Sequence, residues 1–433
     1  MIQTILFQQK MKKKIIYFFS VALICSLSSC EQEYLNPSAA SEQQVVNDVN
    51  GLVTLCNGLQ YRYTISRVSP VYTSITANGL ISREITVLNA GNTDEEFLRL
   101  GGANVQGINS VVSQLWAQNN IIKANADLIL KNLDKVSDPG IKAGILSTAS
   151  IFRALALGNL ATYWEKAPIQ VGTNASFSAR EDLLKEAIKQ LESAAPTAAN
   201  ISPAFVSRVP SGIDYVNTIQ ALIARFNLML GNYDQAMAAA DKVNLTRRSV
   251  YIFDDLSRNP LFDITFSNRN VTEPFNNNFG LSGDLRPDAN DKRIAFFFNS
   301  TAGQNLGRAS FFTSNSSQLP IYRPSEMILI KAEALARKNS LSAAVLEINK
   351  ILTKKTDIFN INADLPEYSG GQSQAEILQE IYKQRCIELY MTGLKVDDSR
   401  RFARPSTERT RSFLPYPQNE RDNNTNTPTD PSF

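Results

Sequence analysis

The side chains of this sequence that are best suited to bind a ligand are aromatic rings in segments rich in turn-forming residues. A flat ring can pack against the C–H face of a sugar, and a nearby amide or guanidinium group can hydrogen-bond its hydroxyls. The rings in such segments are Tyr72, Phe97, Phe275, Phe279 and Phe312. Arg83 lies between the first two rings in the sequence, and Asn277 lies between the next two. We take these seven residues as candidate ligand contacts, with packing inside a loop as the alternative for each.

Pairs of adjacent carboxylates raise the possibility of glycoside hydrolysis, which needs two carboxyl groups ~5–9.5 Å apart. The pairs are Glu95–Glu96, Asp254–Asp255 and Asp397–Asp398. Neighbouring side chains usually diverge, and none of the pairs lies in a hydrolase-like motif, so we interpret them as structural. The sequence also has no histidine, which excludes Ser-His-Asp and Cys-His catalysis and every histidine-containing metal site. We therefore predict no catalytic residue.

An acidic cluster near the middle of the chain is the best candidate for a metal site. Its members are Asp284, Asp288, Asn290 and Asp291. The cluster does not fit the pattern of an EF-hand calcium loop, because Ala289 occupies the position of the invariant glycine and Ala295 that of the bidentate glutamate. A turn held by side-chain hydrogen bonds is the favoured interpretation, and we predict neither a metal nor a cofactor.

Charged residues near the C-terminus have the spacing of ion pairs. Arg385 and Glu388 lie one helical turn apart, and Asp398 is close in sequence to Arg400 and Arg401. These side chains could contact a ligand or could fasten the last helix to the rest of the protein. We favour the structural role.

The four cysteines fall into two groups. Cys25 and Cys30 lie near the N-terminus, whereas Cys56 and Cys386 lie in the body of the chain. None forms a Cys-x-x-Cys pair, and we expect the latter two to be small buried residues rather than a disulfide.

The N-terminal segment has the pattern of a lipoprotein leader. Lysines at positions 12–14 precede an apolar run over residues 15–27, whose helix would rise roughly 20 Å, too short for the ~30 Å hydrocarbon core of a membrane. The run ends in Leu-Ser-Ser-Cys, which resembles the bacterial lipobox, so we predict that Cys30 is the lipid attachment site. Glu31 and Glu33 follow at once and resemble a surface-export signal. A cell-surface lipoprotein of the outer membrane is the expectation.

The rest of the chain reads as a globular, mainly α-helical body. Apolar residues make up 43% of the sequence and charged residues 20%, and the net charge of +3 predicts no nucleic-acid partner. Beyond Cys30 no apolar stretch approaches the ~18 residues of a membrane span. Helical periodicity covers residues 111–133, 141–164, 179–194, 215–230, 233–243, 326–338, 341–352 and 374–391. Trp116 and Trp164 fall within these helices, and we expect both in the core.

Two short helix–turn–helix patterns predict a tetratricopeptide-like repeat scaffold. Gly231 and the Asn339-Ser340 dipeptide mark the turns, and alanines in the second helix of each pair allow close packing. We predict a signal peptide at residues 1–29, a lipidated tether at 30–45 and a single domain at 46–433. Within the domain we expect helical repeats at about 108–245 and 321–392, and loop-rich segments carrying short strands on the ligand side at about 61–107 and 246–320.

The C-terminal third resembles the SusD/RagB family. Its Arg-x-x-Glu helix, its Arg-x-x-Glu-Leu…Asp-x-Arg-Arg segment and its Leu-Pro-x-Pro close all have counterparts here in the family's order. The matching segments are residues 322–334, 347–351, 385–401 and 414–420, with weaker likeness at 115–129, 152–168 and 221–225. Departures from the family pattern occur at Gln384, Thr392, Lys395, Val396 and Ser399, and residues 45–110 match poorly.

The resemblance implies a non-enzymatic surface lipoprotein of the SusD-like α-α superhelix fold. Such proteins bind nutrients, mostly glycans, and deliver them to a SusC-like TonB-dependent transporter in the outer membrane. An oligosaccharide is therefore the expected ligand, and a SusC-like transporter is the expected protein partner. Two alternatives are a RagB-like capture of peptides or glycoproteins, and a helical-repeat scaffold that binds only proteins.

Overall fold

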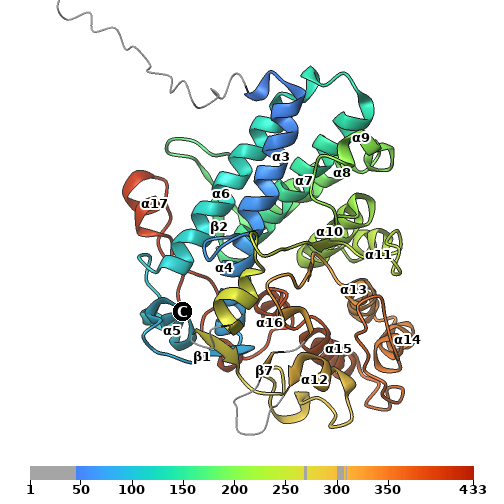
Figure 1. The fold of residues 1–433 in the computed structure, drawn as a ribbon. Coiled ribbons are helices and arrows are strands. Elements are labelled where there is room, and N and C mark those ends of the chain that lie inside the picture. Colours follow the sequence, from blue (N-terminus) through green and yellow to red (C-terminus); the bar gives the residue numbers. More distant parts are fainter. Residues whose placement is uncertain (1–44, 268–270, 300–306, 309) are drawn as a thin grey trace, which may run out of the picture. The chain divides into compact units, whose positions relative to one another are not determined.

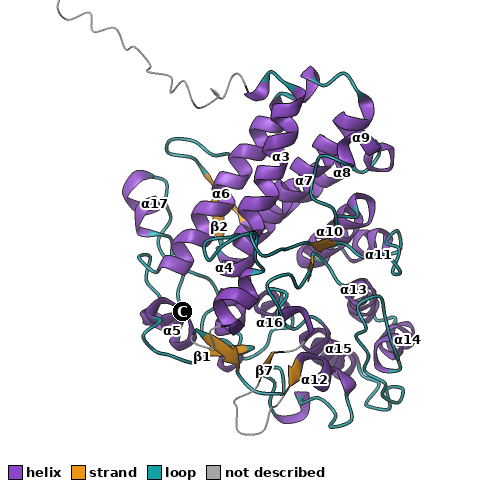
Figure 2. Ribbon diagram, in the orientation of Figure 1, coloured by secondary structure: helices purple, strands orange, loops and turns teal. Residues whose placement is uncertain are grey.

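A computed structural model describes residues 45–267, 271–299, 307–308 and 310–433 of the chain. Figure 1 shows the arrangement of the elements, and Figure 2 shows that helices dominate it, with a few short strands. This confirms the predicted mainly α fold class. Residues 46–433 pack together as one unit. The predicted leader, Cys30 and nearly all of the predicted tether lie outside the described residues.

The first described helices are α3 (Val49–Thr64), α4 (Pro70–Ile81) and α5 (Thr93–Leu100). Helix α4 begins at a proline, which is well suited to the first turn, and the Ser69 hydroxyl accepts a hydrogen bond from the Tyr72 backbone N–H at 3.3 Å. Strand β1 (Ile85–Val87) lies between α4 and α5 in the sequence. Residues 61–107 are thus mainly helical, which corrects the expectation of a loop-rich segment there.

The central helices are α6 (Ser110–Lys131), α7 (Pro139–Tyr163), α8 (Arg180–Ala194) and α10 (Tyr215–Leu230), with the short α9 (Pro203–Val206) between the last two. Strands β2 (Lys166–Pro168) and β3 (Phe177–Ala179) form an antiparallel pair after α7. Among the described helices, α7 alone is long and apolar enough to cross a membrane, but 83% of its most apolar window is buried inside the protein. Because α6, α8 and α10 pack against it, α7 is the central core helix.

Two pairs of consecutive helices pack against each other across short turns. Helix α10 turns at Gly231, whose φ of 78° suits glycine, into α11 (Tyr233–Ala240). Helix α13 (Pro324–Arg337) turns at Asn339 into α14 (Leu341–Leu352). Both pairs were expected from the sequence as helices, and the bounds of α10 and α14 are as predicted. The last helices are α15 (Gln374–Glu388), α16 (Lys395–Arg401) and α17 (Gln418–Asn423).

The segment between α11 and α13 consists of short strands, turns and brief helices. Strand β4 (Val250–Tyr251) pairs with β8 (Leu319–Pro320), and β5 (Thr272–Pro274) pairs with β1. A π-helical turn covers Leu261–Ser267, α12 covers Lys292–Phe297, and β6 (Phe298–Asn299) pairs with β7 (Gly307–Arg308). The character of this segment agrees with the expectation for residues 246–320.

The C-terminal segment returns to the helices of the first half, and Figure 1 shows α17 beside α6. The indole N–H of Trp116 donates to the Glu420 carboxylate, and the indole N–H of Trp164 donates to the Pro415 carbonyl, both at 3.0 Å. Both indoles are buried, at 4% and 0% exposure. The predicted core position of the two tryptophans is confirmed.

Candidate functional site

An open depression lined by three phenylalanines lies where the loop-rich segment meets the chain between α14 and α15. Phe296 comes from α12, Phe311 from a turn after β7, and Phe359 from the loop that follows α14. The cavity volume is about 330 Å³, which is at the lower end of the range for ligand sites. Its polar lining is Arg248, Ser310, Ser317, Gln318 and Asn360.

The three rings form a connected angular wall. The centroids of Phe296 and Phe311 are 5.9 Å apart with an interplanar angle of 76°, and those of Phe311 and Phe359 are 5.7 Å apart at 77°. Edge-to-face packing of this kind is favourable for aromatic rings, so the wall is formed before any ligand arrives. The Arg323 guanidinium lies 4.9 Å from the Phe311 ring and supports it from the protein interior, where Arg323 is 2% exposed.

Arg248 and the loop after α14 hold each other in place. The Arg248 guanidinium lies 5.5 Å from the Phe359 ring and donates to the Ile358 carbonyl through Nε at 2.8 Å and Nη2 at 2.6 Å. The Asp357 carboxylate accepts from the backbone N–H groups of Phe359 and Ile361 at 2.8 and 2.9 Å. The partly exposed rings of Phe296 and Phe311 and a fixed cation therefore stand beside exposed amides, whereas Phe359 is largely buried at 9% exposure. This combination is suited to hydroxyl-rich ligands.

The structure brings three of the sequence-derived candidates together at a second place. Strand pairing of β1 with β5 brings the Phe275 backbone N–H within 3.0 Å of the Glu84 carbonyl, next to Arg83. Gly280 lies so close that a Cβ there would be 2.0 Å from the Arg83 carbonyl oxygen. Arg83, Phe275 and Asn277 are all exposed. Phe97 is 41% exposed on α5, which packs against β1.

Three other candidates are buried, and this corrects their assignment as ligand contacts. Tyr72 is 0% exposed in α4, where its hydroxyl lies 3.2 Å from the Glu95 carboxylate. Phe279 is 0% exposed and packs against Phe298 and Tyr390 at 4.8 and 5.4 Å, and Phe312 is 2% exposed. These rings anchor the irregular segments to the core and present no face to a ligand.

The depression itself was missed by the sequence analysis. Phe296 begins a run of three phenylalanines, and Phe311 directly precedes the candidate Phe312, but neither of these residues nor Phe359 was taken as a candidate. Arg248 and Phe359 are far apart in the chain and meet only in the folded protein. The signal that was available is the concentration of phenylalanines in residues 246–320.

The charged residues near the C-terminus form buried ion pairs that join helices. Arg385 donates to Asp398 at 2.8 and 2.9 Å, and Arg401 donates to Glu333 at 2.8 Å. Glu388 does not pair with Arg385, as the spacing suggested, but accepts from Arg293 at 3.0 Å and from Lys354. The structural role favoured for this group is confirmed.

The adjacent carboxylates also have structural partners. Glu95 pairs with Arg67 at 2.5 Å, and Asp397 pairs with Arg180 at 2.7 Å. The Asp254 carboxylate accepts from two backbone N–H groups in its own turn at 2.8 and 2.6 Å. These contacts hold helices and turns in place.

The candidate metal and disulfide residues are accounted for in the same way. The Asp288 carboxylate accepts from the Asn290 backbone N–H at 2.8 Å, and Asp291 caps α12 and pairs with Arg293. Within the described ranges no group of three or more His, Cys, Asp or Glu side chains is placed to hold a metal ion. Cys56 and Cys386 are buried free thiols, as predicted, and burial raises the pKa of each.

Comparison with known proteins gives a consistent picture. Residues 268–431 match the sequence model of the SusD family. A SusD superfamily protein from Bacteroides vulgatus ATCC 8482 is 15% identical, with a TM-score of 0.66 over 90% of this chain and 98% of that one. A SusD-like carbohydrate-binding protein from Bacteroides fragilis NCTC 9343 is 14% identical, with a TM-score of 0.68 over 88% and 99%. NanU of B. fragilis is 13% identical, with a TM-score of 0.63 over 92% and 99%.

None of the curated proteins matches the chain. At these identities the solved structures establish the fold, and the family's sequence pattern extends over the part of the chain from the loop-rich segment to α17 and beyond. The chain therefore has the fold of the SusD-like structures and carries the sequence pattern of the SusD family over residues 268–431.

Proposed function

We propose that this protein is a cell-surface lipoprotein that captures oligosaccharides and delivers them to a SusC-like TonB-dependent outer-membrane transporter. The observation that carries the proposal is the aromatic depression of Phe296, Phe311 and Phe359 on a SusD-like fold. A solved neighbour with the same fold is described as a carbohydrate-binding protein.

The geometry suits a sugar chain that is held and then released without chemical change. Two neighbouring rings at 76–77° to each other present faces in different directions, so a bent oligosaccharide can stack on more than one of them. The exposed amides of Gln318 and Asn360 can bond to hydroxyls around the edge. A cavity of about 330 Å³ suits a short oligosaccharide segment rather than a long run of sugars.

The charge of the lining bears on which sugars are accepted. Arg248 is its one charged residue, and the lining contains no carboxylate. A sugar that carries a carboxylate would therefore meet an attractive field, whereas an amino sugar would meet a repulsive one. We expect neutral and acidic oligosaccharides to bind more tightly than basic ones.

Isothermal titration of the purified protein against an oligosaccharide library tests the proposal. Phe296→Ala should weaken binding by about 2 kcal/mol, roughly 30-fold, because it removes a partly exposed ring from the wall. Gln318→Ala should have a smaller effect and leave folding intact, since that side chain is exposed. Tyr61→Ala is the matched control, because Tyr61 is 59% exposed on α3 and does not line the depression.

The outcome of the titration distinguishes the proposed function from its alternatives. Binding that is lost in Phe296→Ala and retained in Tyr61→Ala supports glycan capture at the depression. Binding of peptides without binding of oligosaccharides would replace it with peptide capture. A stable complex with an outer-membrane protein, together with no binding of any small ligand, would favour the alternative of a scaffold that binds only proteins.

Membrane attachment is tested at Cys30. The wild-type protein should fractionate with the outer membrane and carry lipid on its N-terminal cysteine, visible by mass spectrometry. Cys30→Ala should remove the lipid and release the protein from the membrane fraction. Cys25→Ala is the control, because that cysteine lies inside the predicted leader. A Cys30→Ala protein that remains fully membrane-bound would contradict the anchor.

A further inference from the structure

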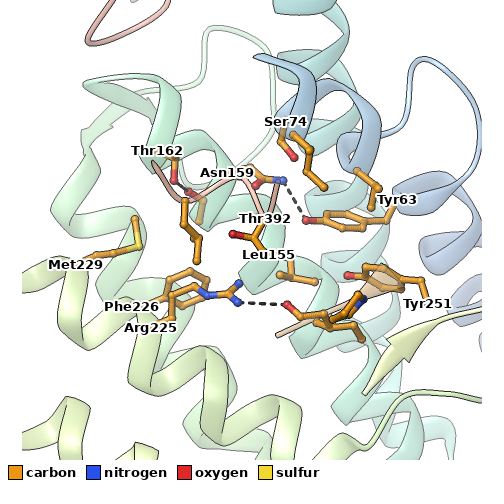
Figure 3. Close-up of a pocket in the computed structure, with 17 residues that line it drawn as sticks. Tyr63, Ser74, Leu155, Asn159, Thr162, Arg225, Phe226, Met229, Tyr251 and Thr392 are labelled. Atoms are coloured by element: carbon orange, nitrogen blue, oxygen red, sulfur yellow. Dashed lines mark hydrogen bonds between the residues drawn. The ribbon is translucent and has the colours of Figure 1, made fainter. Parts of the chain in front are cut away.

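A pocket inside the helical part of the protein is separate from the aromatic depression. It lies between α3, α4, α7 and α10, and is closed on its remaining sides by β4, β8 and residues 392–394 (Figure 3). Its volume is about 70 Å³. Ile75, Met229 and Thr392 are among the partly exposed members of its lining.

Hydroxyl groups converge on this pocket without a complete set of partners. Tyr251 is 4% exposed and Ser74 is 6% exposed, and neither hydroxyl has a hydrogen-bond partner among the described residues. The Tyr63 hydroxyl accepts from the Asn159 side-chain amide at 3.1 Å, which leaves its own proton free to donate. Figure 3 shows the hydroxyls of Tyr63 and Tyr251 pointing toward the same space. The Tyr251 and Ser74 oxygens are not among the fully buried polar atoms that lack a partner, so they reach open space in the pocket and are available to bond a polar molecule there.

Arg225 contributes a guanidinium that is only partly used. Its Nε and Nη2 donate to the two carboxylate oxygens of Glu326 at 2.6 and 2.7 Å, and Nη2 also donates to the Ile321 carbonyl at 3.2 Å. Its Nη1 has no partner within the described part of the chain. Glu326 is 1% exposed and stands behind the guanidinium, so this buried pair is neutral as a whole.

The charge balance decides which class of ligand fits. The lining contains Arg225 and no Asp, Glu or Lys, and much of the rest of it is apolar, including Val71, Leu155 and Phe226. Because Glu326 already neutralises Arg225, an anion would add an unbalanced charge to a buried site, which is costly. A neutral molecule with several hydroxyls matches the available donors and acceptors at no such cost.

The volume sets the size of that molecule. One water needs ~10–15 Å³ of cavity measured in this way, so there is space for about five or six non-hydrogen atoms. We propose that this interior pocket binds a small neutral polyol of the size of glycerol, either free or as the hydroxylated end of a larger sugar. The site involves none of the residues of the depression and does not depend on the proposed glycan capture.

Saturation-transfer NMR with the purified protein tests the pocket directly. Glycerol and ethylene glycol are the free-polyol probes, glucose represents the end of a sugar, and acetate is the anionic comparator. A molecule of this size should bind with Kd on the order of 1–10 mM. Signal from the polyols with little or none from acetate is the expected result. A glucose signal that is also lost in the pocket variants described below would show that the pocket accepts the end of a sugar as well as a free polyol.

Two variants locate the binding. Tyr251→Phe keeps the ring and removes the hydroxyl, and Ser74→Ala removes the second hydroxyl, so each should weaken polyol binding roughly fivefold. The thermal unfolding midpoint of Tyr251→Phe should stay unchanged, since that hydroxyl has no partner in the described chain. Arg248→Ala in the depression is the control and should leave polyol binding unchanged while it weakens oligosaccharide binding.

Several results would overturn the pocket as a polyol site. They are the absence of polyol signal, tighter binding of acetate than of glycerol, equal polyol binding in Tyr251→Phe and Ser74→Ala, and loss of polyol binding in Arg248→Ala. The last result would place the polyol in the depression. Failure of oligosaccharide capture alone would leave the pocket untouched, so the two proposals fail separately.

Discussion

Glu84 is a carboxylic acid held inside the protein with only part of its hydrogen-bonding capacity used. It is 1% exposed, and one carboxylate oxygen accepts from the Met391 backbone N–H at 3.2 Å. The other oxygen has no partner in the described ranges. Burial raises the pKa of Glu84 to about 7, against the opposing effects of Lys395 and the Met391 N–H. Its backbone carbonyl also accepts from Phe275, beside the exposed candidates Arg83 and Asn277.

We predict that Glu84 makes the protein less stable as the pH rises from ~4.3, the pKa of an unfolded glutamate, to about 7. In that window the folded state keeps a proton that the unfolded state loses, so the free energy of unfolding falls. Glu84→Gln should remove this fall and raise stability at pH 8 by about 3 kcal/mol relative to the wild type, with little change at pH 4. Urea unfolding at pH 4 and pH 8 measures this difference in the free energy of unfolding.

The control for Glu84 is Glu192→Gln on the exposed side of α8. That variant should show the same pH dependence as the wild type. If Glu84→Gln and the wild type differed equally at pH 4 and pH 8, the carboxyl would not titrate in this window.

At the scale of single residues, the sequence was informative where the surrounding helix decided the environment. Trp116 and Trp164 are buried as predicted, because helical periodicity places them on the inner face, and the two body cysteines are buried as expected for small apolar side chains. The local sequence gave the wrong prediction for Tyr72, Phe279 and Phe312, because an aromatic ring among turn-forming residues can either anchor a loop or face solvent. Which of these happens depends on distant residues such as Tyr390.

Among the elements, α7 depends on glycines where other helices approach it most closely. A Cβ at Gly144 would lie 2.3 Å from the Phe205 ring, and a Cβ at Gly158 would lie 2.5 Å from the Phe226 ring. Real Cβ atoms do not come so near, so each phenylalanine occupies the space that a side chain would need. The glycines lower the intrinsic stability of the helix but allow these contacts.

Gly158→Ala is therefore expected to destabilise the protein by about 1–3 kcal/mol, although alanine is the better helix former. The matched control is Gly58→Ala in α3, where a new Cβ meets nothing within 4 Å and should stabilise by up to ~1 kcal/mol. Chemical unfolding of both variants measures these two opposite changes in the free energy of unfolding. Stabilisation by Gly158→Ala would mean that Phe226 moves aside at little cost.

Element prediction succeeded for α10 and α14 and failed for α4. The bounds of α10 and α14 follow from their 3.6-residue pattern. Helix α4 is buried on almost every side and contains threonines and a glycine, so neither periodicity nor propensity marks it. Its helical state is imposed by packing against α3, α5 and α6.

Across the whole molecule, buried ion pairs tie distant segments together. Asp397 in α16 accepts from Arg180 at the start of α8 and from Arg400 and Arg401 in its own helix. Burial alone would raise the pKa of Asp397, but Arg400, Arg180 and Arg401 outweigh it and bring the pKa to about 2. Lys354 and Arg293 likewise outweigh burial at Glu388, whose pKa is also about 2.

Asp397→Asn should destabilise the protein by about 3–5 kcal/mol at pH 7, because three arginines lose a buried partner. The lowered pKa also predicts how this effect on stability changes with pH. The stability that Asp397 contributes is fully present above ~3.9, the pKa of an unfolded aspartate, and is lost as the pH falls toward 2. Wild type and variant should thus converge at acid pH in urea unfolding. Asp134→Asn, at a fully exposed position, is the control and should match the wild type throughout.

The overall architecture followed from the sequence mainly through the family resemblance, which gave the order of the helical segments in the last third. The meeting of Arg248 with Phe359 across the depression did not follow, because it depends on how β4 and the loop after α14 are placed. The transporter partner, the anchor and the sugar stay predictions that the experiments above address.

The return of the C-terminal segment over the first helices has a consequence for synthesis. Trp116 and Trp164 are covered by residues near Pro415 and Glu420, which leave the ribosome after almost everything else. A growing chain therefore carries two uncovered indoles on its early helices throughout most of translation, and it can complete its core only once the end has been made. A premature stop codon even shortly before Pro415 would leave the two indoles without the residues that cover them.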